Sequence, residues 1–306
     1  MQYHQALEKK EEFLVYVQVE RNLTDNTYKS YSSDLHQFFT FWKEHNEQTK
    51  KDVAIKTALE FFFVQHFYKK TQKSSLARKI SCFTSFERFL KSNGIVLNLQ
   101  LTRPKVEKKL PTYLTVQEIF YLLDTVQDKD LPSHRPIRDK AIFEVLYATG
   151  IRCSELTQIR LEDINFQEKT ILIKGKGRKQ RYVLFGEKAK TKIIEYMNAE
   201  RFINDRGNSI LFVNAQGESL TNRTIQMILN MFGKFLTVKK QLTPHKVRHS
   251  FATHLLNAGL DLRALQELLG HQSLSSTEKY THVTTKDLQN MYNTIHPINS
   301  MFPIIK

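Results

Sequence analysis

The chain has 306 residues, of which 41% are hydrophobic and 25% charged, a composition typical of a folded protein and too apolar for a disordered one. Its 46 lysines and arginines against 31 acidic residues give a formal net charge of +15, which favours a polyanionic partner, nucleic acid ahead of an anionic membrane surface. Two cysteines are too few for a disulfide framework or a cysteine-rich zinc site, and neither a signal peptide nor a bilayer-spanning run is found, so we expect a cytoplasmic protein.

Helical periodicity dominates the first hundred residues. Apolar residues recur three or four positions apart at Phe13 and Val17, and again over residues 35–42. Further helical patterns cover residues 54–68 and 75–91. Aromatic residues at this spacing usually belong to a core, so we assign them to packing rather than to base stacking. The sequence therefore predicts a four-helix N-terminal domain over residues 1–103.

A basic stretch bounded by prolines, residues 104–111, has no apolar periodicity and is typical of a linker. Beyond it, Thr115 and Glu118 have the spacing of a capping box, which predicts the start of a helix. Residues 138–149 show another helical pattern, ended by Gly150.

Two apolar or alternating segments, residues 169–174 and 180–185, flank a glycine-rich basic turn and predict a β-hairpin with a basic tip. We expect a further short strand at residues 210–213, then helices over residues 221–236, 245–258 and 262–269 and near the C-terminus. Residues 112–290 thus form a second domain. The expected fold class is mainly α with a small β-hairpin sheet.

Four segments place cationic or proton-transferring side chains beside a glycine or a predicted helix end. They are Thr149-Gly-Ile-Arg-Cys-Ser-Glu155, Lys174-Gly-Lys-Gly-Arg178, Thr243-Pro-His-Lys-Val-Arg-His249 and Leu269-Gly-His271, with Tyr280 beyond. Together they predict a site for a phosphate group.

The segment from Pro244 to Leu256, the Leu-Leu-Gly-His sequence ending at His271, and Tyr280-Thr-His282 are similar to those of the tyrosine recombinases. The His-x-x-Arg pair, the upstream Gly-Ile-Arg-x-x-Glu and the spacing from His271 to Tyr280 match as an ordered series, which is more specific than any one motif. Within that family the chain most resembles the Xer group over essentially its whole length, with sharp motifs in the catalytic half only. The resemblance implies a helical SAM-like core-binding domain followed by a mixed α/β catalytic domain, which together clamp DNA.

The resemblance also implies an enzyme that cuts and rejoins DNA through a 3′-phosphotyrosine intermediate, with Tyr280 as the nucleophile. Arg152 and Arg248 would hydrogen-bond the non-bridging phosphate oxygens and stabilise charge in the transition state. Lys176 matches the hairpin lysine of the family, which protonates the leaving 5′ oxygen; the alternative is one solvated cation among its basic neighbours.

Two histidines and one carboxylate complete the expected site. His245 lies one helical turn before Arg248 and is expected to act as a base toward the tyrosine hydroxyl. His271 matches a family position that hydrogen-bonds a non-bridging oxygen or assists proton transfer. Glu155 is expected to support the site, with a surface ion pair as the alternative.

A metal site is an alternative interpretation, because His245 and His249 are four residues apart, as in some helical zinc sites. Lys246 between them, and the absence of an obvious third ligand, argue against this interpretation. Gly175-Lys176-Gly177 is too short for a phosphate-binding loop of an ATPase. We therefore expect neither a metal nor a cofactor, and we expect Cys153 to be a packed side chain.

The Xer resemblance implies the resolution of chromosome or plasmid dimers at cell division, on a double-stranded DNA recombination site. The protein would act as a homo- or hetero-tetramer, and whether a paralogous recombinase or an activating partner takes part stays open. Residues 291–306 form a C-terminal tail expected to dock on a neighbouring protomer, with packing on its own domain as the alternative. The competing functions are a mobile-element or phage integrase, a type IB topoisomerase, and a DNA-binding protein without catalysis.

Overall fold

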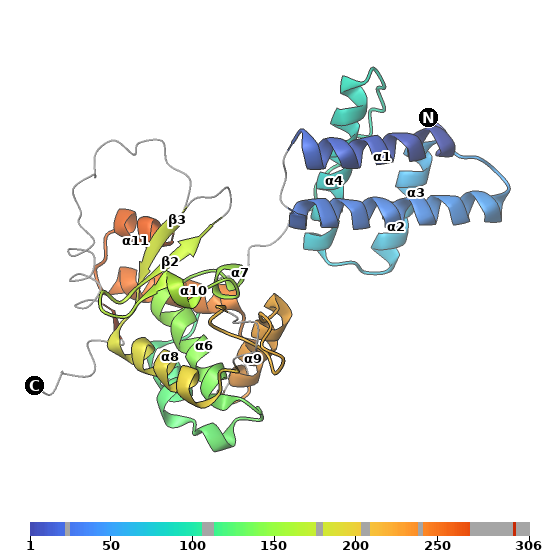
Figure 1. Cartoon of the computed structure of the whole chain (residues 1–306). Helices are drawn as coiled ribbons and strands as arrows, with labels where there is room; N and C mark the ends of the chain where they lie inside the picture. The colour runs from blue at the N-terminus through green and yellow to red at the C-terminus, as the bar shows by residue number, and fades with distance from the viewer. Residues whose placement is uncertain are drawn as a thin grey trace, which may run out of the picture. The chain divides into compact units, whose positions relative to one another are not determined.

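The computed structural model describes residues 1–21, 25–105, 113–175, 180–202, 209–237, 241–269 and 296–297. The chain divides into two compact units, Met1–Lys109 and Leu110–Lys306 (Figure 1). Each unit has a hydrophobic core of its own. Of the predicted linker, residues 104–111, only the first two lie within the described part of the chain. No helix among the described residues is long and apolar enough to cross a membrane.

Four helices form the first unit, as the periodicity predicts: α1 (Tyr3–Val19), α2 (Asp25–Thr49), α3 (Ile55–Tyr68) and α4 (Lys73–Ser92). The aromatic residues of the predicted helices are core residues, because Phe13, Phe38 and Trp42 are all fully buried. The Trp42 indole Nε1 donates a hydrogen bond of 3.1 Å to the carbonyl oxygen of Val53, which satisfies its polar atom inside the core.

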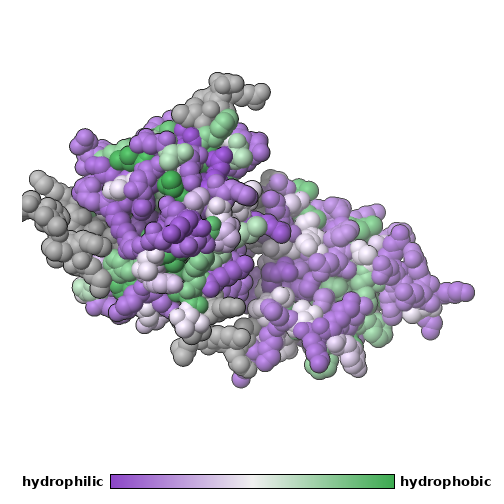
Figure 2. Space-filling view, turned by 90° about the horizontal axis from the view of Figure 1, so that it is seen from below, coloured by the Kyte–Doolittle hydropathy of each residue, from purple (hydrophilic) through white to green (hydrophobic). Residues whose placement is uncertain are grey.

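A buried carboxylate joins α2 to α4. Asp34 on α2 is fully buried, and it accepts hydrogen bonds from Arg78 and, at 3.0 Å, from Lys79, both on α4. These two cations offset the free-energy cost of burying an ionised carboxylate. The outer surface is mostly hydrophilic on the face seen in Figure 2, where apolar residues are scattered.

The second unit begins with the predicted capping box. Thr115 accepts a hydrogen bond of 3.1 Å from the backbone N–H of Glu118, and the Glu118 carboxylate accepts one of 2.8 Å from the backbone N–H of Thr115. Helix α5 (Val116–Phe120) starts there and continues as a π-helical turn, η1 (Tyr121–Thr125), followed by a 3₁₀ turn, η2 (Asp128–Asp130).

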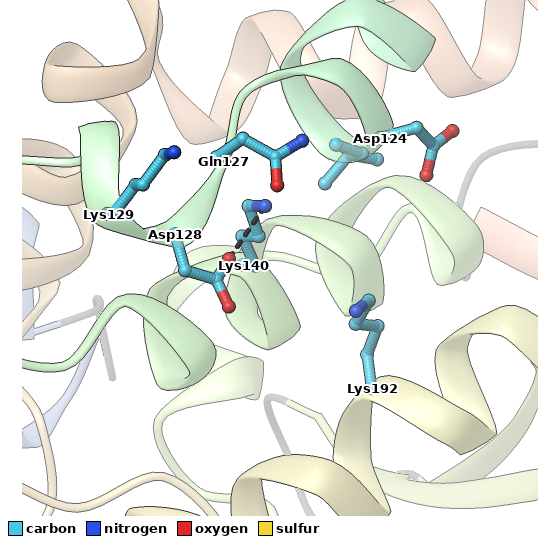
Figure 3. A pocket seen from close by; sticks show the side chains of 7 residues that line it. Asp124, Gln127, Asp128, Lys129, Lys140 and Lys192 are labelled. Atoms are coloured by element: carbon cyan, nitrogen blue, oxygen red, sulfur yellow. Dashed lines mark ion pairs between the residues drawn. The ribbon is translucent and has the colours of Figure 1, made fainter.

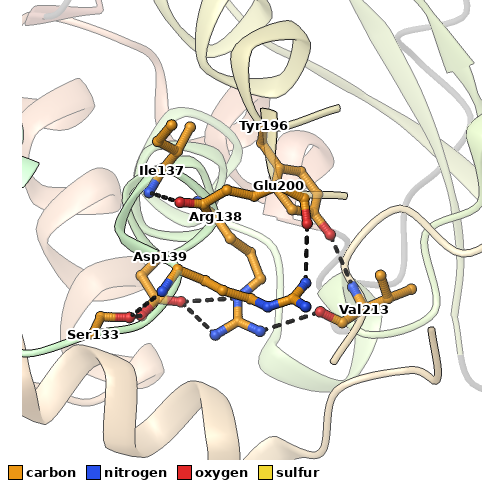
Figure 4. A network of polar contacts seen from close by, with 8 residues as sticks. Ser133, Ile137, Arg138, Asp139, Tyr196, Glu200 and Val213 are labelled. Atoms are coloured by element: carbon orange, nitrogen blue, oxygen red, sulfur yellow. Dashed lines mark hydrogen bonds and ion pairs between the residues drawn. The ribbon is translucent and has the colours of Figure 1, made fainter. Parts of the chain in front are cut away.

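Helix α6 (Pro136–Thr149) runs through the centre of this unit and is buried at every residue from Asp139 onward. Its start is held by a polar network, drawn in Figure 4. The two carboxylate oxygens of Glu200 accept hydrogen bonds from the backbone N–H groups of Ile137 and Arg138, at 3.2 and 2.8 Å. The Arg138 guanidinium pairs with Asp139 at 2.8 Å. Because the first N–H groups of a helix have no partner within it, these contacts allow α6 to begin inside the protein.

The predicted hairpin is confirmed. Strands β2 (Thr170–Lys174) and β3 (Gln180–Leu184) pair antiparallel, with Ile173 opposite Arg181 and Lys174 opposite Gln180. A two-residue strand that the sequence analysis did not predict, β1 (Ile164–Asn165), pairs with β2 and completes a three-stranded sheet in the order β1-β2-β3. The hairpin tip, residues 176–179, lies outside the described residues.

Three of the later predicted helices are also present: α9 (Asn222–Gly233), α10 (Pro244–Asn257) and α11 (Leu262–Leu269). The helix expected near the C-terminus lies outside the described residues. Two helices, α7 (Cys153–Leu156) and α8 (Glu187–Ala199), were not predicted. The 3₁₀ turn η3 (Leu161–Asp163) was not predicted either. The expected strand at residues 210–213 was wrong, because Ile210 and Val213 make only isolated bridges, to Arg160 and to Ser219.

Candidate active site

The turn from α6 to α7 is built on Gly150. This residue ends α6 with a left-handed φ of +60°, and a Cβ atom there would lie 2.3 Å from a ring carbon of Phe251 on α10. Only glycine fits both the backbone conformation and the close approach of α10. The turn therefore holds Arg152, the residue immediately before α7, close to α10.

Glu155 is the acceptor at the centre of the site. Its side chain is only 6% exposed, and its two oxygens accept hydrogen bonds from the backbone N–H of Arg152 at 2.8 Å and from the Arg152 guanidinium at 3.0 Å. Arg181 donates two further bonds, one to each oxygen, both at 2.9 Å. Burial alone would raise the pKa of Glu155, but the bonds from Arg181 and Arg152 outweigh it and hold that pKa below its ordinary value. Glu155 therefore stays ionised at neutral pH.

Arg248 on α10 binds the same turn from the other side. Its Nη1 donates to the carbonyl oxygen of Gly150 at 2.6 Å, and its Nη2 donates to the carbonyl oxygen of Leu269, at the end of α11, at 2.8 Å. Burial, and then the positive charge of Arg152, lower the pKa of Arg248 to about 10. The guanidinium is thus still a cation at neutral pH, held between two main-chain segments.

His245 lies in the first turn of α10. Thr243 caps this helix by accepting a hydrogen bond of 3.2 Å from the backbone N–H of Lys246, and Pro244 occupies the first helical position. The His245 side chain is exposed, one helical turn before Arg248. It is therefore exposed at a capped helix start, where it is accessible to a substrate.

The structure thus describes four of the seven predicted site residues, and it joins Arg152, Glu155 and Arg248 around the Gly150 turn. The other three, Lys176, His271 and Tyr280, lie outside the described residues.

Arg181 is part of this cluster and was not predicted. Its side chain is 17% exposed, and it lies on β3 at a position where the apolar pattern of the strand leads one to expect a hydrophobic residue. A cation inside an otherwise half-buried strand requires a buried acidic partner. That requirement was the one sequence signal that could have indicated Arg181 as part of the site. The sequence does not say which of the acidic residues is its partner.

Two further histidines, His254 and His296, and the Cys153 thiol pack against the second core. His254 is buried, and its Nδ1 shares a hydrogen bond of 2.8 Å with the hydroxyl of Tyr147; burial lowers the pKa of this histidine. His296, in the predicted tail, is buried against the rings of Tyr147 and Phe251 of the same chain. Burial raises the pKa of Cys153 to about 11, so the thiol is not ionised at neutral pH.

A polar surface pocket of about 470 Å³ lies elsewhere on the second unit (Figure 3). It is lined by Leu123, Asp124, Gln127, Asp128, Lys129, Lys140 and Lys192. Lys140 is paired with Asp128 at 2.7 Å and donates to the carbonyl oxygen of Val126 at 2.6 Å. None of the described site residues lines this pocket, and a duplex phosphate can meet an exposed group of cations without a deep cavity.

Comparison with known protein families gives two matches. Residues 112–287 match the phage integrase family, and residues 11–94 match the N-terminal SAM-like domain of phage integrases. The two matches fall on the two compact units of the chain.

Curated relatives extend the likeness over nearly the whole chain. Tyrosine recombinase XerC of Oceanobacillus iheyensis is 40% identical over 292 residues, which cover 93% of this chain and 94% of the relative. Tyrosine recombinase XerC of Staphylococcus aureus strain MSSA476 is 39% identical, over 94% of this chain and 96% of the relative. The crystal structure of the XerH site-specific recombinase bound to its difH substrate has the same fold, with a TM-score of 0.65 and 24% identity over 90% of this chain and 78% of that one. The chain therefore belongs to the phage integrase family and, within it, to the Xer group of tyrosine recombinases.

Proposed function

We propose that the protein is a site-specific recombinase that cuts and rejoins DNA through a covalent 3′-phosphotyrosine at Tyr280. The observation that carries the proposal is the cluster around Gly150, where Arg152 and Arg248 are fixed by hydrogen bonds on one turn. Two preorganised guanidiniums suit the non-bridging oxygens of a phosphodiester, whose charge increases during attack.

The proposed reaction begins when the Tyr280 hydroxyl oxygen attacks the phosphorus and loses its proton to His245. The bond from phosphorus to the 5′ oxygen breaks, and the leaving oxygen takes a proton from Lys176. His271 would hydrogen-bond a non-bridging oxygen in the transition state. Because a phosphotyrosine conserves the energy of the broken bond, a second 5′ hydroxyl can reverse the reaction without ATP. This chemistry also requires no metal or other cofactor.

The high identity to proteins named XerC supports a role for this recombinase in resolving chromosome or plasmid dimers at cell division. We propose that it works in the cytoplasm on double-stranded DNA, as a tetramer formed with itself or with a paralogous recombinase. The net charge of +15 supports a DNA partner for the protein as a whole. We further propose that the tail, residues 291–306, docks on a neighbouring protomer. Because His296 packs against Tyr147 and Phe251 of its own chain, the docking contacts would come from its other residues.

The test starts from DNA that the protein itself selects. Tyr280→Phe protein is used to enrich bound duplexes from a random-sequence pool, and the enriched site is then synthesised with a nick beside the scissile phosphate. Wild type, with EDTA and without ATP, should form a protein–DNA adduct on a denaturing gel, and Tyr280→Phe should bind without forming one. An adduct from both proteins would contradict the role of Tyr280. Binding without any adduct would favour either a missing partner or a non-catalytic DNA-binding protein. Relaxation of supercoiled DNA that lacks the site would favour a topoisomerase.

A further inference from the structure

Arg181 reaches the candidate site from a different element than the residues that the motifs identify. It lies on β3, opposite Ile173 of β2, whereas Glu155 lies on α7 and Arg248 on α10. Both terminal nitrogens of its guanidinium are used in the paired bonds to Glu155, at 2.9 Å each. Since the side chain is also only 17% exposed, Arg181 lies behind Glu155 rather than on the surface that would meet DNA.

The Arg152 side chain, in contrast, is 44% exposed, and its guanidinium donates one bond to Glu155, at 3.0 Å. The rest of its guanidinium can still donate to a phosphate, because this group carries five N–H donors. The alignment of Arg152 therefore depends on a carboxylate that is itself negative and close to the expected position of the scissile phosphate.

Such a carboxylate has two opposite effects. It orients Arg152, but its charge cancels that of the cation and repels a phosphate. Arg181 supplies the compensating charge: the cluster contains three guanidiniums against the one carboxylate of Glu155, and the charges of Arg152, Glu155 and Arg181 all act on Arg248. A bidentate arginine is well suited to this function, since it occupies a lone pair on each carboxylate oxygen.

We propose that Arg181 is a positioning residue that acts as the counter-cation of Glu155, so that Glu155 aligns Arg152 without cancelling its attraction for the scissile phosphate. The proposal rests on the recombinase function proposed above. It assigns Arg181 an effect on cleavage without contact with DNA.

The experiment is a double-mutant cycle on the nicked duplex described above, with the rate of adduct formation as the readout. With Glu155 intact, Arg181→Ala should slow the reaction by about 10- to 100-fold, because an uncompensated carboxylate then faces the phosphate. In the Glu155→Gln background the same Arg181→Ala change should slow it by less than about 3-fold, since no carboxylate charge remains to be compensated. Arg181→Lys keeps the charge and should be faster than Arg181→Ala.

Arg160→Ala is the matched control, because Arg160 pairs with Glu162 at 3.5 Å on an exposed part of the same unit. This variant should react at the wild-type rate. Thermal unfolding by circular dichroism establishes that each variant is folded before its rate is compared.

An equal loss of rate from Arg181→Ala in both backgrounds would overturn the proposal, because it would mean that Arg181 only fastens β3 to α7. Arg181→Lys no faster than Arg181→Ala would overturn it as well. Failure of the wild-type protein to form an adduct is a different result, which would count against the recombinase function or indicate a missing partner and would leave the rates of the Arg181 variants without a reference.

Discussion

Arg248 donates hydrogen bonds to two main-chain carbonyl oxygens from a partly buried position, and this burial costs hydration free energy. A guanidinium that is partly removed from water loses hydration, which is why burial lowers its pKa to about 10. The carbonyls of Gly150 and Leu269 replace part of the lost hydration and fix the direction of the side chain. A cation fixed in advance needs little reorganisation when charge develops on the phosphate.

Arg248→Ala should therefore keep much of the DNA binding but raise the activation free energy of cleavage by several kcal/mol, because transition-state stabilisation is lost. Arg248→Lys should recover only part of the rate, because an ammonium cannot reproduce the two-pronged contact to both carbonyls. Binding is measured by gel shift and cleavage by adduct formation. Cleavage by Arg248→Ala at the wild-type rate would exclude Arg248 from the site.

The packing of α6 against α8 buries an acidic residue that no motif indicates. Glu144 on α6 is fully buried, and its nearest cation is the Lys188 ammonium on α8, at 3.9 Å. Lys188 makes its shorter contact, 2.6 Å, with Asp124. Burial therefore dominates and raises the pKa of Glu144 to about 7.

This shift predicts a dependence of stability on pH. Between the unfolded pKa of about 4.5 and the folded pKa of about 7, the folded chain binds the proton more tightly, so the contribution of Glu144 to stability falls as pH rises through that window. Glu144→Gln removes the charge and keeps the shape. It should raise the free energy of unfolding by roughly 1–3 kcal/mol at pH 8 and by much less at pH 5.

Urea unfolding of wild type and Glu144→Gln at both pH values measures this difference. Glu168→Gln, a change at an exposed position of the same unit, is the control and should alter stability little at either pH. A Glu144→Gln variant less stable than wild type at pH 8 would show that the carboxylate is more strongly paired than the structure indicates.

At the scale of the whole molecule, the chain has two hydrophobic cores with no residue in common. The single tryptophan of the sequence, Trp42, is fully buried in the first core. Its fluorescence therefore reports on one unit, whereas far-ultraviolet circular dichroism reports on the helices of both.

We expect these two probes to give different unfolding midpoints in urea. Leu229→Ala, in the second core, should lower the free energy of unfolding of the second unit by about 2–5 kcal/mol. It should leave the fluorescence midpoint unchanged, because Trp42 lies in the first core. Leu90→Ala, in the first core, should lower the fluorescence midpoint. A single midpoint that both variants shift together would mean that the two units unfold as one.

Much of the architecture could be predicted because it depends on local signals. Helix periodicity, the capping box at Thr115 and the turn at Gly150 all report on neighbouring residues, and the helices they predict are present. Helix α8 carried such a signal too, since Ala189, Ile193 and Tyr196 are buried at helical spacing, but its lysine-rich sequence was not recognised. The strand expected at residues 210–213 was wrong because an apolar run does not reveal whether a partner strand exists.

By itself, the sequence determined which residues are expected to carry the chemistry, because Arg152, His245 and Arg248 belong to short motifs whose order and spacing are specific. Only the tertiary structure decided what holds them. The contacts of Arg181 with Glu155 and of Arg248 with Gly150 join residues 26 and 98 positions apart. Periodicity and spacing describe contacts within one element, whereas the choice of a partner for a buried charge depends on how elements pack in three dimensions.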